Sequence, residues 1–557
     1  MLARLAIVLA SLAAVLVAPF LLRPEEEKVS EKAERLVIIT PHIESIQAEF
    51  TRAFRAHMRA AHGREVAIDW RQPGGTSEIS RFLRSEYSTR FETLWRERTG
   101  LPFTLAIRDA FTNPKLDPDK HTSRGDFSVE PPPLKGAAPE AQAAAARQLF
   151  LESDIGAGID LFFGGGAFDF ERQAAAGLLV ARDAGGQFGP AAIAETHPTW
   201  FTDAVMPQSF SGEPFRDPAY RWVGTVLSAF GICYNRDSLA RLGIETPPDE
   251  WSDLEDPRYR GHVALADPTK SGSTTKAFEM LVQERIQTLA RDRGLSGEAA
   301  VAAGWNEAMR LILRISANSR YFTDSSAKVP RDVAMGDAAV GMCIDFYGRS
   351  YHELYRDPAT GESRIEFVMP RGGTSIGADP IGLLRGAPHP ELAHHFIEFV
   401  LSPEGQKIWN YRVGAPGGPT RHALRRPPIR RDFYVEANFP HMTDPTFDPY
   451  RAAEGFTYHP EWTGSLFAPL RFVIRAACMD PHEEQIAAWE ALVASGLPAE
   501  GVAAFEAVEP ISYEAVVQQI GPALKNSDKV AQVRLGRELA EQFRKSYLAI
   551  AAEYGGR

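Results

Sequence analysis

Near its N-terminus the chain changes twice from the apolar pattern of a strand to that of a helix. Residues 36–40 read Leu-Val-Ile-Ile-Thr, a short apolar and β-branched run typical of a buried parallel strand. Over residues 43–58 the apolar side chains recur every three or four positions, as they do on one face of a helix. An alternating run at 66–70 then precedes a second helical pattern that starts at Ile79. This alternation predicts a parallel sheet with helical crossovers, and therefore an α/β fold.

A second block of the same kind follows farther along the chain. Its expected strands are 262–266 and 338–344, with a helix over 299–315 between them. Two long apolar segments connect the blocks, one at 222–234 and the other at 365–369, which continues after a turn as 381–384. Two α/β blocks joined by two extended crossings predict a two-lobed protein whose hinge consists of two crossing strands.

A chain of 557 residues is long enough to bury two or three cores. The following boundaries are expected: lobe 1 over 36–225, with a surface insertion at about 110–148; lobe 2 over 226–368; a return to lobe 1 through the hinge over 369–425; and a helical C-terminal extension over 426–557. The last of these should end in an amphipathic helix from about Val530 to Tyr554.

The first 22 residues predict an export signal or a membrane anchor. The run Leu5–Leu22 is apolar apart from Ser11 and about as long as a bilayer is thick, and a charged linker over 23–35 follows it. Glu25, Glu26 and Glu27 lie directly after the run, so the positive N-terminal end should stay inside. Whether the segment is cleaved or anchors the chain in the inner membrane, the protein is expected to work in the periplasm or at the cell exterior.

Charge and cysteine content exclude several functional classes. The net charge of −11, without a long basic run, argues against nucleic acid as a partner. Cys233, Cys343 and Cys478 are too few and too scattered for a disulfide framework or a zinc site, and they are expected to be small buried apolar residues. No cofactor is expected.

The loops after the strands of lobe 1 are the first part of an expected ligand site. In open parallel sheets, ligands bind beyond the carboxyl ends of the strands, where helix N-termini expose free N–H groups. Glycines in these loops let the backbone approach a ligand, and hydroxyls offer hydrogen bonds. The candidates are Thr40, His42, Gly75, Thr76, Ser77, Gly165 and Gly166. Helix capping is the alternative role for Thr76 or Ser77.

The matching loops of lobe 2 supply the other half. Residues 269–275 carry five hydroxyls, with Lys270 and Lys276 near the two ends of the loop, a composition that suits an oxyanion at a helix N-terminus. A capping loop without a ligand is the alternative. The candidates in this lobe are Ser271, Gly272, Ser273, Thr274, Asp345 and Tyr347.

Enzyme classes are one alternative to this binding role. Gly373–Gly377 fits the G-x-S-x-G pattern of serine hydrolases, which requires a strand before the serine and a helix after it. Asp379-Pro380 leads instead into another apolar extended run, so Ser375 is expected in a turn between the lobes and no catalytic residue is expected. The loop before Lys276 lacks the G-K-[ST] ending of a nucleotide-binding loop. A ligand-sensing receptor that acts through a signalling partner is the remaining alternative.

The order of these motifs also resembles a known family. The segments are LVIITPHIESIQAEFTRAF, WRQPGGTSE, DLFFGGGAFDF, GICYNRDSL, ADPTKSGSTT, AVGMCIDFYGR and GGTSIGADPIGLLRGAPHPELAHHFIEFVLSPEGQKIW. Between about Leu36 and Arg421 they resemble the extracellular, or periplasmic, solute-binding proteins of ABC importers, which include ferric-iron receptors. The resemblance implies two lobes that close on a solute, and a membrane permease with its ATPase as partners.

The resemblance also bears on the ligand. Ferric-iron members use two adjacent tyrosines after a strand of the second lobe, with a histidine and a carboxylate from the first. Phe346 and Tyr347 stand at that place here, and His42 and Glu44 are the corresponding lobe 1 residues. Phe346 cannot ligate a metal, so a phosphorylated or other oxyanion-bearing solute is favoured and ferric iron comes second.

Overall fold

The computed structural model describes residues 33–116, 134–526 and 528–556. The expected signal or anchor over 1–22, most of the linker and the middle of the expected insertion lie outside these residues. Within the three described ranges, no helix is both long and apolar enough to cross a membrane.

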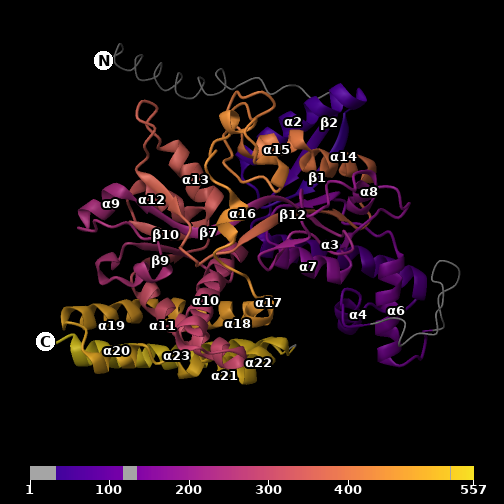
Figure 1. The fold of residues 1–557 in the computed structure, drawn as a ribbon. Helices are drawn as coiled ribbons and strands as arrows, with labels where there is room; N and C mark the ends of the chain where they lie inside the picture. Colours follow the sequence, from indigo (N-terminus) through magenta and orange to yellow (C-terminus); the bar gives the residue numbers. More distant parts are fainter. Residues whose placement is uncertain (1–32, 117–133, 527, 557) are drawn as a thin grey trace, which may run out of the picture.

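Ten strands form one sheet path through the whole molecule (Figure 1). Their order is β2-β1-β3-β12-β7-β10-β8-β9, with β4 added to β12 and β11 to β7. The strands are β1 (Glu34–Ile39), β2 (Val66–Arg71), β3 (Leu161–Phe163), β4 (Leu179–Val180), β7 (Val223–Asn235), β8 (Val263–Ala266), β9 (Ser319–Thr323), β10 (Val340–Ile344), β11 (Ile365–Val368) and β12 (Ile376–Leu384). A separate hairpin joins β5 (Ser209–Phe210) to β6 (Glu213–Pro214).

Strand β7 belongs to both halves of this sheet. Its first part, up to Ala229, pairs with β12 of lobe 1, and its second part, from Phe230, pairs with β10 and β11 of lobe 2. The chain returns through β11 and then β12, which gives the second crossing. The two predicted crossings are therefore present, and the change of partners between Ala229 and Phe230 marks the hinge.

In lobe 1 the pleat of β1 divides the core between two faces. Leu36 and Ile38 face a cluster under α2, α14 and α15, whereas Val37 and Ile39 face a cluster under α3, α6 and α7. Each fully buried Leu or Ile contributes about 1.5–3 kcal/mol. The helices of this lobe are α2 (Glu44–His62), α3 (Thr76–Thr99), α4 (Leu105–Ala110), α6 (Pro139–Glu152), α7 (Ala167–Ala176), α8 (Pro190–Thr196), α14 (Pro390–Leu401) and α15 (Pro403–Asn410).

Lobe 2 repeats this plan with a thinner layer on one side. Val329 and Val333 of α12 pack with Cys233 and Cys343 on one face, so two of the cysteines are the small buried residues that the sequence predicts, as is Cys478. Helices α10 and α11 cover the other face. The helices of this lobe are α9 (Arg236–Arg241), α10 (Gly272–Arg293), α11 (Gly297–Ala317), α12 (Lys328–Met335) and α13 (Asp345–Leu354), with 3₁₀ turns at Trp251–Glu255 and Pro257–Tyr259.

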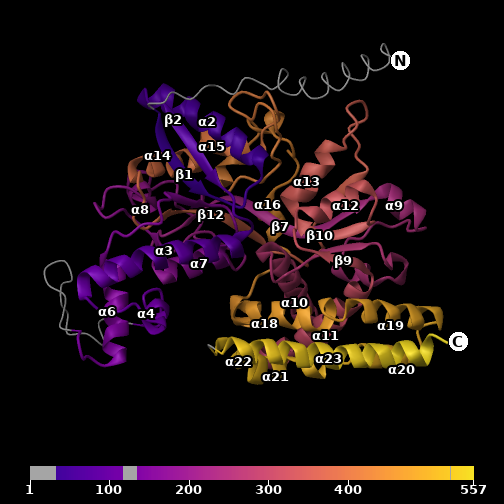
Figure 2. The same ribbon diagram turned by 180° about the vertical axis from the view of Figure 1, so that it is seen from behind.

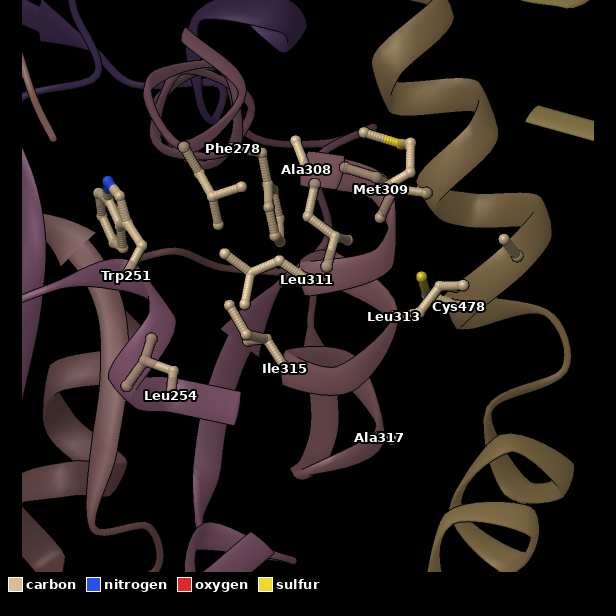
Figure 3. Packing of buried hydrophobic residues seen from close by; sticks show 14 of the residues in the cluster. Trp251, Leu254, Phe278, Ala308, Met309, Leu311, Leu313, Ile315, Ala317 and Cys478 are labelled. Atoms are coloured by element: carbon tan, nitrogen blue, oxygen red, sulfur yellow. The ribbon is translucent and has the colours of Figure 1, made fainter. Parts of the chain in front are cut away.

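The last part of the chain forms a helical layer on the outside of lobe 2 (Figures 1 and 2). These C-terminal helices are α17 (Pro460–Thr463), α18 (Phe467–Ile474), α19 (His482–Ala494), α20 (Ala499–Phe505), α21 (Tyr513–Ala515), α22 (Gly521–Lys525) and α23 (Lys529–Tyr554). They share one core with α10 and α11. Figure 3 shows Cys478 from this layer beside Leu313 of α11.

Two expected boundaries differ in the structure. The sequence predicts that the extension starts at residue 426, but Ile429, Tyr450 and Ala453 belong to the lobe 1 core, and the short helix α16 (Pro449–Ala453) lies there too. It also predicts a surface insertion through 148, yet α6 starts at Pro139 and buries Ala144, Ala145 and Ala146. The second difference has a simple cause: alanine side chains are small, so the alanine-rich helix α6 packs closely against its neighbours. The α/β class, the two crossings and the helical C-terminal region are confirmed.

Candidate functional site

The predicted loops of the two lobes meet face to face. A Cβ placed on Gly272, at the first position of α10, would lie 2.9 Å from Oγ1 of Thr76 at the first position of α3. A Cβ on Gly75 would lie 3.5 Å from the carbonyl oxygen of Lys270. Two helix N-termini from opposite lobes therefore point at one place, which we call the interlobe site.

The hydroxyls at these two helix starts have different roles. Helix α3 is preceded by Gly75, and no side chain caps it, so the alternative capping role for Thr76 and Ser77 is wrong. In α10, by contrast, Oγ of Ser271 accepts a hydrogen bond from the N–H of Thr274 at 3.2 Å and is the N-cap. The hydroxyl of Ser273 lies 3.0 Å from that of Ser271. Ser273 is partly buried and is not the N-cap of α10.

Glycines in lobe 1 let these loops pack without a gap. Gly165 has a φ of +121°, and a Cβ there would come within 2.4 Å of Cγ2 of Thr76. A Cβ on Gly164 would come within 2.4 Å of the His42 ring. Gly166 precedes α7 as its N-cap residue. The close approach of these loops therefore requires glycine at 164 and 165, whereas a Cβ on Gly166 would have nothing within 4 Å.

Thr40 and His42 lie deeper, at the end of β1. The Thr40 hydroxyl donates to the carbonyl oxygen of Phe163 at 2.6 Å and accepts from the N–H of His42 at 3.0 Å, so it fixes the loop. His42 is 2% exposed, and its Nε2 lies 3.8 Å from the Asp379 carboxylate. Burial lowers the pKa of His42, against the opposing effect of Asp379. Its Nδ1 is buried without a hydrogen-bond partner among the described residues.

Arg426 is not among the predicted site residues, yet it occupies the centre of the hinge. It is fully buried, donates to the Asp379 carboxylate at 2.7 Å and to the Ser228 hydroxyl, and stacks over the Phe346 ring of lobe 2 with its Cζ 4.7 Å from the ring centroid. Burial alone would raise the pKa of Asp379, but Arg426 and His42 hold it below its usual value. One sequence signal was available, because Pro427 and Pro428 follow Arg426 and favour an extended path. In the structure this path runs beside β7, where the N–H of Leu227 donates to the Pro427 carbonyl.

The lobe 2 candidates Asp345 and Tyr347 lie at the start of α13, next to Arg426. Burial raises the pKa of Asp345 to about 6, against the effect of Arg349 and Arg426. Burial also raises the pKa of Tyr347 to about 12, so its phenol keeps its proton at neutral pH. Phe346 packs on the Tyr347 ring at a centroid distance of 4.1 Å. The structure thus brings His42, Asp345 and Tyr347 around one buried arginine.

A metal centre finds little support in these groups. Glu44, the lobe 1 carboxylate considered for ferric iron, is exposed at the start of α2. Phe346 occupies the position of the second tyrosine and is covered by the Arg426 cation, which opposes a metal ion there. Within the described part of the chain, no group of three His, Cys, Asp or Glu residues could hold a metal.

Two further residues at the interlobe site escaped the sequence reasoning. Asp169, in the first turn of α7, accepts a hydrogen bond from Thr76, and its Oδ2 would lie 3.4 Å from a Cβ on Gly272. Burial raises the pKa of Asp169. Arg471, from α18 of the C-terminal helices, donates from Nε to the Thr275 hydroxyl at 2.8 Å. Asp169 lies in the DLFFGGGAFDF segment, where only the glycines were considered, whereas Arg471 lies in none of the segments that carry the resemblance.

A buried ion cluster lies along α10, one turn beyond the site. Nζ of Lys276 lies 3.1 Å from a carboxylate oxygen of Glu213 in lobe 1 and 3.1 Å from one of Glu279 in lobe 2. Although burial alone would lower it, the two carboxylates raise the pKa of Lys276. The Tyr458 hydroxyl donates to Glu279 at 2.9 Å, and the Ser375 hydroxyl donates to Glu213.

Ser375 does not have the surroundings of a hydrolase nucleophile. It is buried, and strand β12 starts at the next residue, where the nucleophile elbow requires a helix. Its hydroxyl is held by Glu213, an acceptor that fixes it in the hinge.

A hollow also lies away from the interlobe site. A groove of about 820 Å³ runs between residues 244–259 of lobe 2 and helices α19 and α20. Its carboxylates Glu255 and Glu506 both pair with Arg314, at 2.6 and 2.7 Å. None of the predicted site residues lines it. A groove does not by itself mark a ligand site, and here two of its carboxylates already pair with Arg314.

Comparisons with known proteins identify part of the chain. Residues 185–433 match the model of a family described as "Bacterial extracellular solute-binding protein". This range includes β7, the loop before α10, α13 and β12, and it ends before the C-terminal helices. The predicted resemblance starts at Leu36, so the match is shorter at the N-terminal side.

Individual relatives are distant and longer than the matched part. An uncharacterized protein of Haemophilus influenzae is 29% identical over 253 residues, which cover 45% of this chain and 60% of that protein. The phosphoglycerate transport regulatory protein PgtC of Salmonella typhimurium is 25% identical over 186 residues, which cover 33% and 40%. The structure of the periplasmic binding protein AfuA from Actinobacillus pleuropneumoniae is 18% identical with a TM-score of 0.41, covering 67% of this chain and 81% of that one. The chain thus spans about half the length of these curated relatives, and over residues 185–433 it matches the bacterial extracellular solute-binding proteins, which confirms the predicted resemblance for that part.

Proposed function

We propose that this protein is the extracytoplasmic solute-binding component of an ABC importer, which captures a small oxyanion-bearing solute between its lobes. The observation that carries the proposal is the meeting of the N-termini of α3 and α10 at the interlobe site. Each helix N-terminus carries about half a positive charge and unpaired N–H groups. Two such ends that face each other from opposite lobes favour an anion between them.

The hydroxyls around this point suit an oxyanion. Thr76 comes from lobe 1 and Ser273 from lobe 2, so one phosphate or carboxylate could accept hydrogen bonds from both. A ligand that contacts both lobes favours the closed arrangement, because its binding energy depends on their approach. Delivery then requires a partner that opens the lobes, and we expect this partner to be a membrane permease with its ATPase.

This role needs no catalytic residue. Asp379, Lys276 and Ser375 are bonded to other parts of the fold, which suits a hinge that must keep its geometry while the lobes move. The same family points to a place of action outside the cytoplasm.

A melting screen of the full chain tests the proposal. The probes are inorganic phosphate, 3-phosphoglycerate, glucose 6-phosphate, methylphosphonate, sulfate, ferric citrate and the diamine putrescine. A solute that binds only the folded state at 100 times its Kd adds about 2.7 kcal/mol to stability, so an anionic probe should raise Tm. A shift with putrescine or ferric citrate alone, or no shift at millimolar concentration, would sink the proposal.

Ser273 offers a sharper variant than Ser271. Because Ser271 caps α10, its replacement by alanine lowers stability by about 1 kcal/mol whatever the ligand. Ser273→Ala should weaken binding of the best anionic probe by about 1–3 kcal/mol, the scale of a hydrogen bond to a charged group. Ser296→Ala is the matched control, since this exposed serine precedes α11 without capping it. Equal affinity in both variants would remove Ser273 from the site.

A further inference from the structure

Helix α18 of the C-terminal helices is fixed on lobe 2. Its residues Leu470, Val473 and Ile474 are buried in the core that α10 and α11 form. In both views α18 lies next to the lower end of α10, at the boundary between the two halves of the molecule (Figures 1 and 2). The helix lies outside the range 185–433 that matches the solute-binding family. Its position is therefore a feature of this chain beyond the family part.

The same helix reaches lobe 1. The Phe467 ring at its start lies 4.5 Å, centroid to centroid, from the Phe168 ring in the first turn of α7. Phe168 is next to Asp169, which accepts a hydrogen bond from Thr76 at the interlobe site. Helix α18 thus contacts one lobe through its buried face and the other through its first residue, and it forms a third wall beside the meeting point of α3 and α10.

Arg471 projects from this wall toward the meeting point. Its Nε donates to Thr275 at 2.8 Å, and its Cζ lies 4.7 Å over the Phe467 ring, so two contacts fix the guanidinium. Its Nη2 is buried and has no hydrogen-bond partner among the described residues. A Cβ on Gly272 would lie 3.7 Å from this Nη2 and 2.9 Å from the Thr76 hydroxyl oxygen, so both groups lie at the N-terminus of α10.

An unpartnered guanidinium nitrogen costs free energy unless a ligand satisfies it. Arg471 forms no ion pair with a carboxylate of the described residues. Burial lowers the pKa of its guanidinium, and the nearby carboxylates Asp169 and Glu78 oppose this shift. Phosphate and carboxylate are the groups that guanidinium binds best, often with two parallel hydrogen bonds. The nitrogen lies where the two helix N-termini already favour an anion.

We propose that Arg471 binds the anionic group of the solute, so that the C-terminal helices complete the interlobe site. This inference rests on the proposed function, because it assumes that an anion binds between the lobes. It adds a specificity-determining residue from a part of the chain that the family match does not include. The site then holds an anion by two helix ends, one from each lobe, and by one fixed cation from α18.

The test compares Arg471→Gln with two reference variants by calorimetric titration of the full chain. The probe is whichever of inorganic phosphate, 3-phosphoglycerate and glucose 6-phosphate raises the wild-type Tm most. Arg471→Gln should weaken binding about 10- to 100-fold, the range for a hydrogen bond to a charged partner. Arg471→Lys should recover part of this loss, because it keeps the charge. Arg475→Gln, an exposed arginine one turn along that pairs with Asp480, should bind like the wild type.

Each outcome separates the inference from the proposed function. If Arg471→Gln binds as the wild type does, while Ser273→Ala binds more weakly, the solute lies between the lobes without Arg471 and the inference is overturned alone. If no anionic probe binds the wild type, both fail. The Tm of Arg471→Gln without ligand should stay within about 2 °C of the wild type, because α18 keeps its buried residues. If this variant loses binding because it unfolds, and Arg471→Lys does not restore binding, the inference is also overturned.

Discussion

Arg426 and Arg471 both point into the region between the lobes, but they differ in what satisfies them. Arg426 is fully buried, is paired with Asp379 and contacts both lobes through the hinge. Arg471 is held by a hydroxyl and a ring, and one of its nitrogens has no hydrogen-bond partner among the described residues. The difference separates two kinds of arginine. A structural arginine such as Arg426 has its counter-ion within the protein, whereas an arginine that binds a ligand keeps a nitrogen available for an anion from outside.

The largest effect is expected at the hinge. Arg426→Met should lower the free energy of unfolding by about 3–5 kcal/mol, because it leaves the Asp379 carboxylate buried and unpaired. Denaturation with urea measures this loss. Adding Asp379→Asn to that variant should recover much of it, since the uncompensated charge is then removed. A loss below about 1 kcal/mol in the single variant would mean that Arg426 is not the structural member of the pair.

The two buried aspartates next to these arginines should respond to pH in opposite ways. The pKa of Asp379 is lowered, so its charge stabilises the fold above about pH 4, the unfolded value, and that stability is lost as pH falls through the folded pKa. The pKa of Asp169 is raised by burial, so the fold is favoured at low pH and loses that advantage as pH rises through the raised pKa.

At pH 7, therefore, Asp379→Asn should lower Tm and Asp169→Asn should raise it. An anion at the interlobe site should also bind more tightly at lower pH in the wild type, since it favours protonated Asp169, and this dependence should disappear in Asp169→Asn. The groups around Asp169 that share in this titration are Arg471 of α18, Glu78 of α3 and Arg172 of its own helix. Thermal melts between pH 4 and 8 provide the measurement; Tm changes of the same sign in both variants would break the comparison.

The smallest effect on stability is expected at Arg471. Arg471→Gln should change the free energy of unfolding by less than about 1 kcal/mol, because its partners are a hydroxyl and a ring and no carboxylate is left unpaired. Urea denaturation beside Arg426→Met shows the contrast directly. A loss comparable to that of Arg426→Met would make Arg471 a structural residue as well.

The sequence predicts the scaffold well because its signals are local. The periods of the apolar residues place β1, α2 and β2, and the long strand β7 is recognisable as one extended crossing. The rule that ligands bind beyond the carboxyl ends of parallel strands is enough to predict that Thr76 and Gly272 lie close together, although they are 196 residues apart in the sequence.

What escaped prediction depends on tertiary contacts. Arg426 reads as one of several surface arginines, and only the fold puts it beside Asp379 and Phe346. Arg471 lies in a region expected to be a mere extension, and its approach to Thr275 depends on how α18 docks on α10. Such contacts have no periodic signature, so single-sequence reasoning found the loops but not the charged groups that act on them.

Hydrogen–deuterium exchange of the full chain with and without its best anionic probe tests the central claim most directly. If the solute binds between the lobes and α18 completes the site, residues 74–78, 270–276 and 467–474 should all gain protection in the same experiment. Protection confined to 244–259 and 497–506, the segments that line the separate groove, would contradict the account.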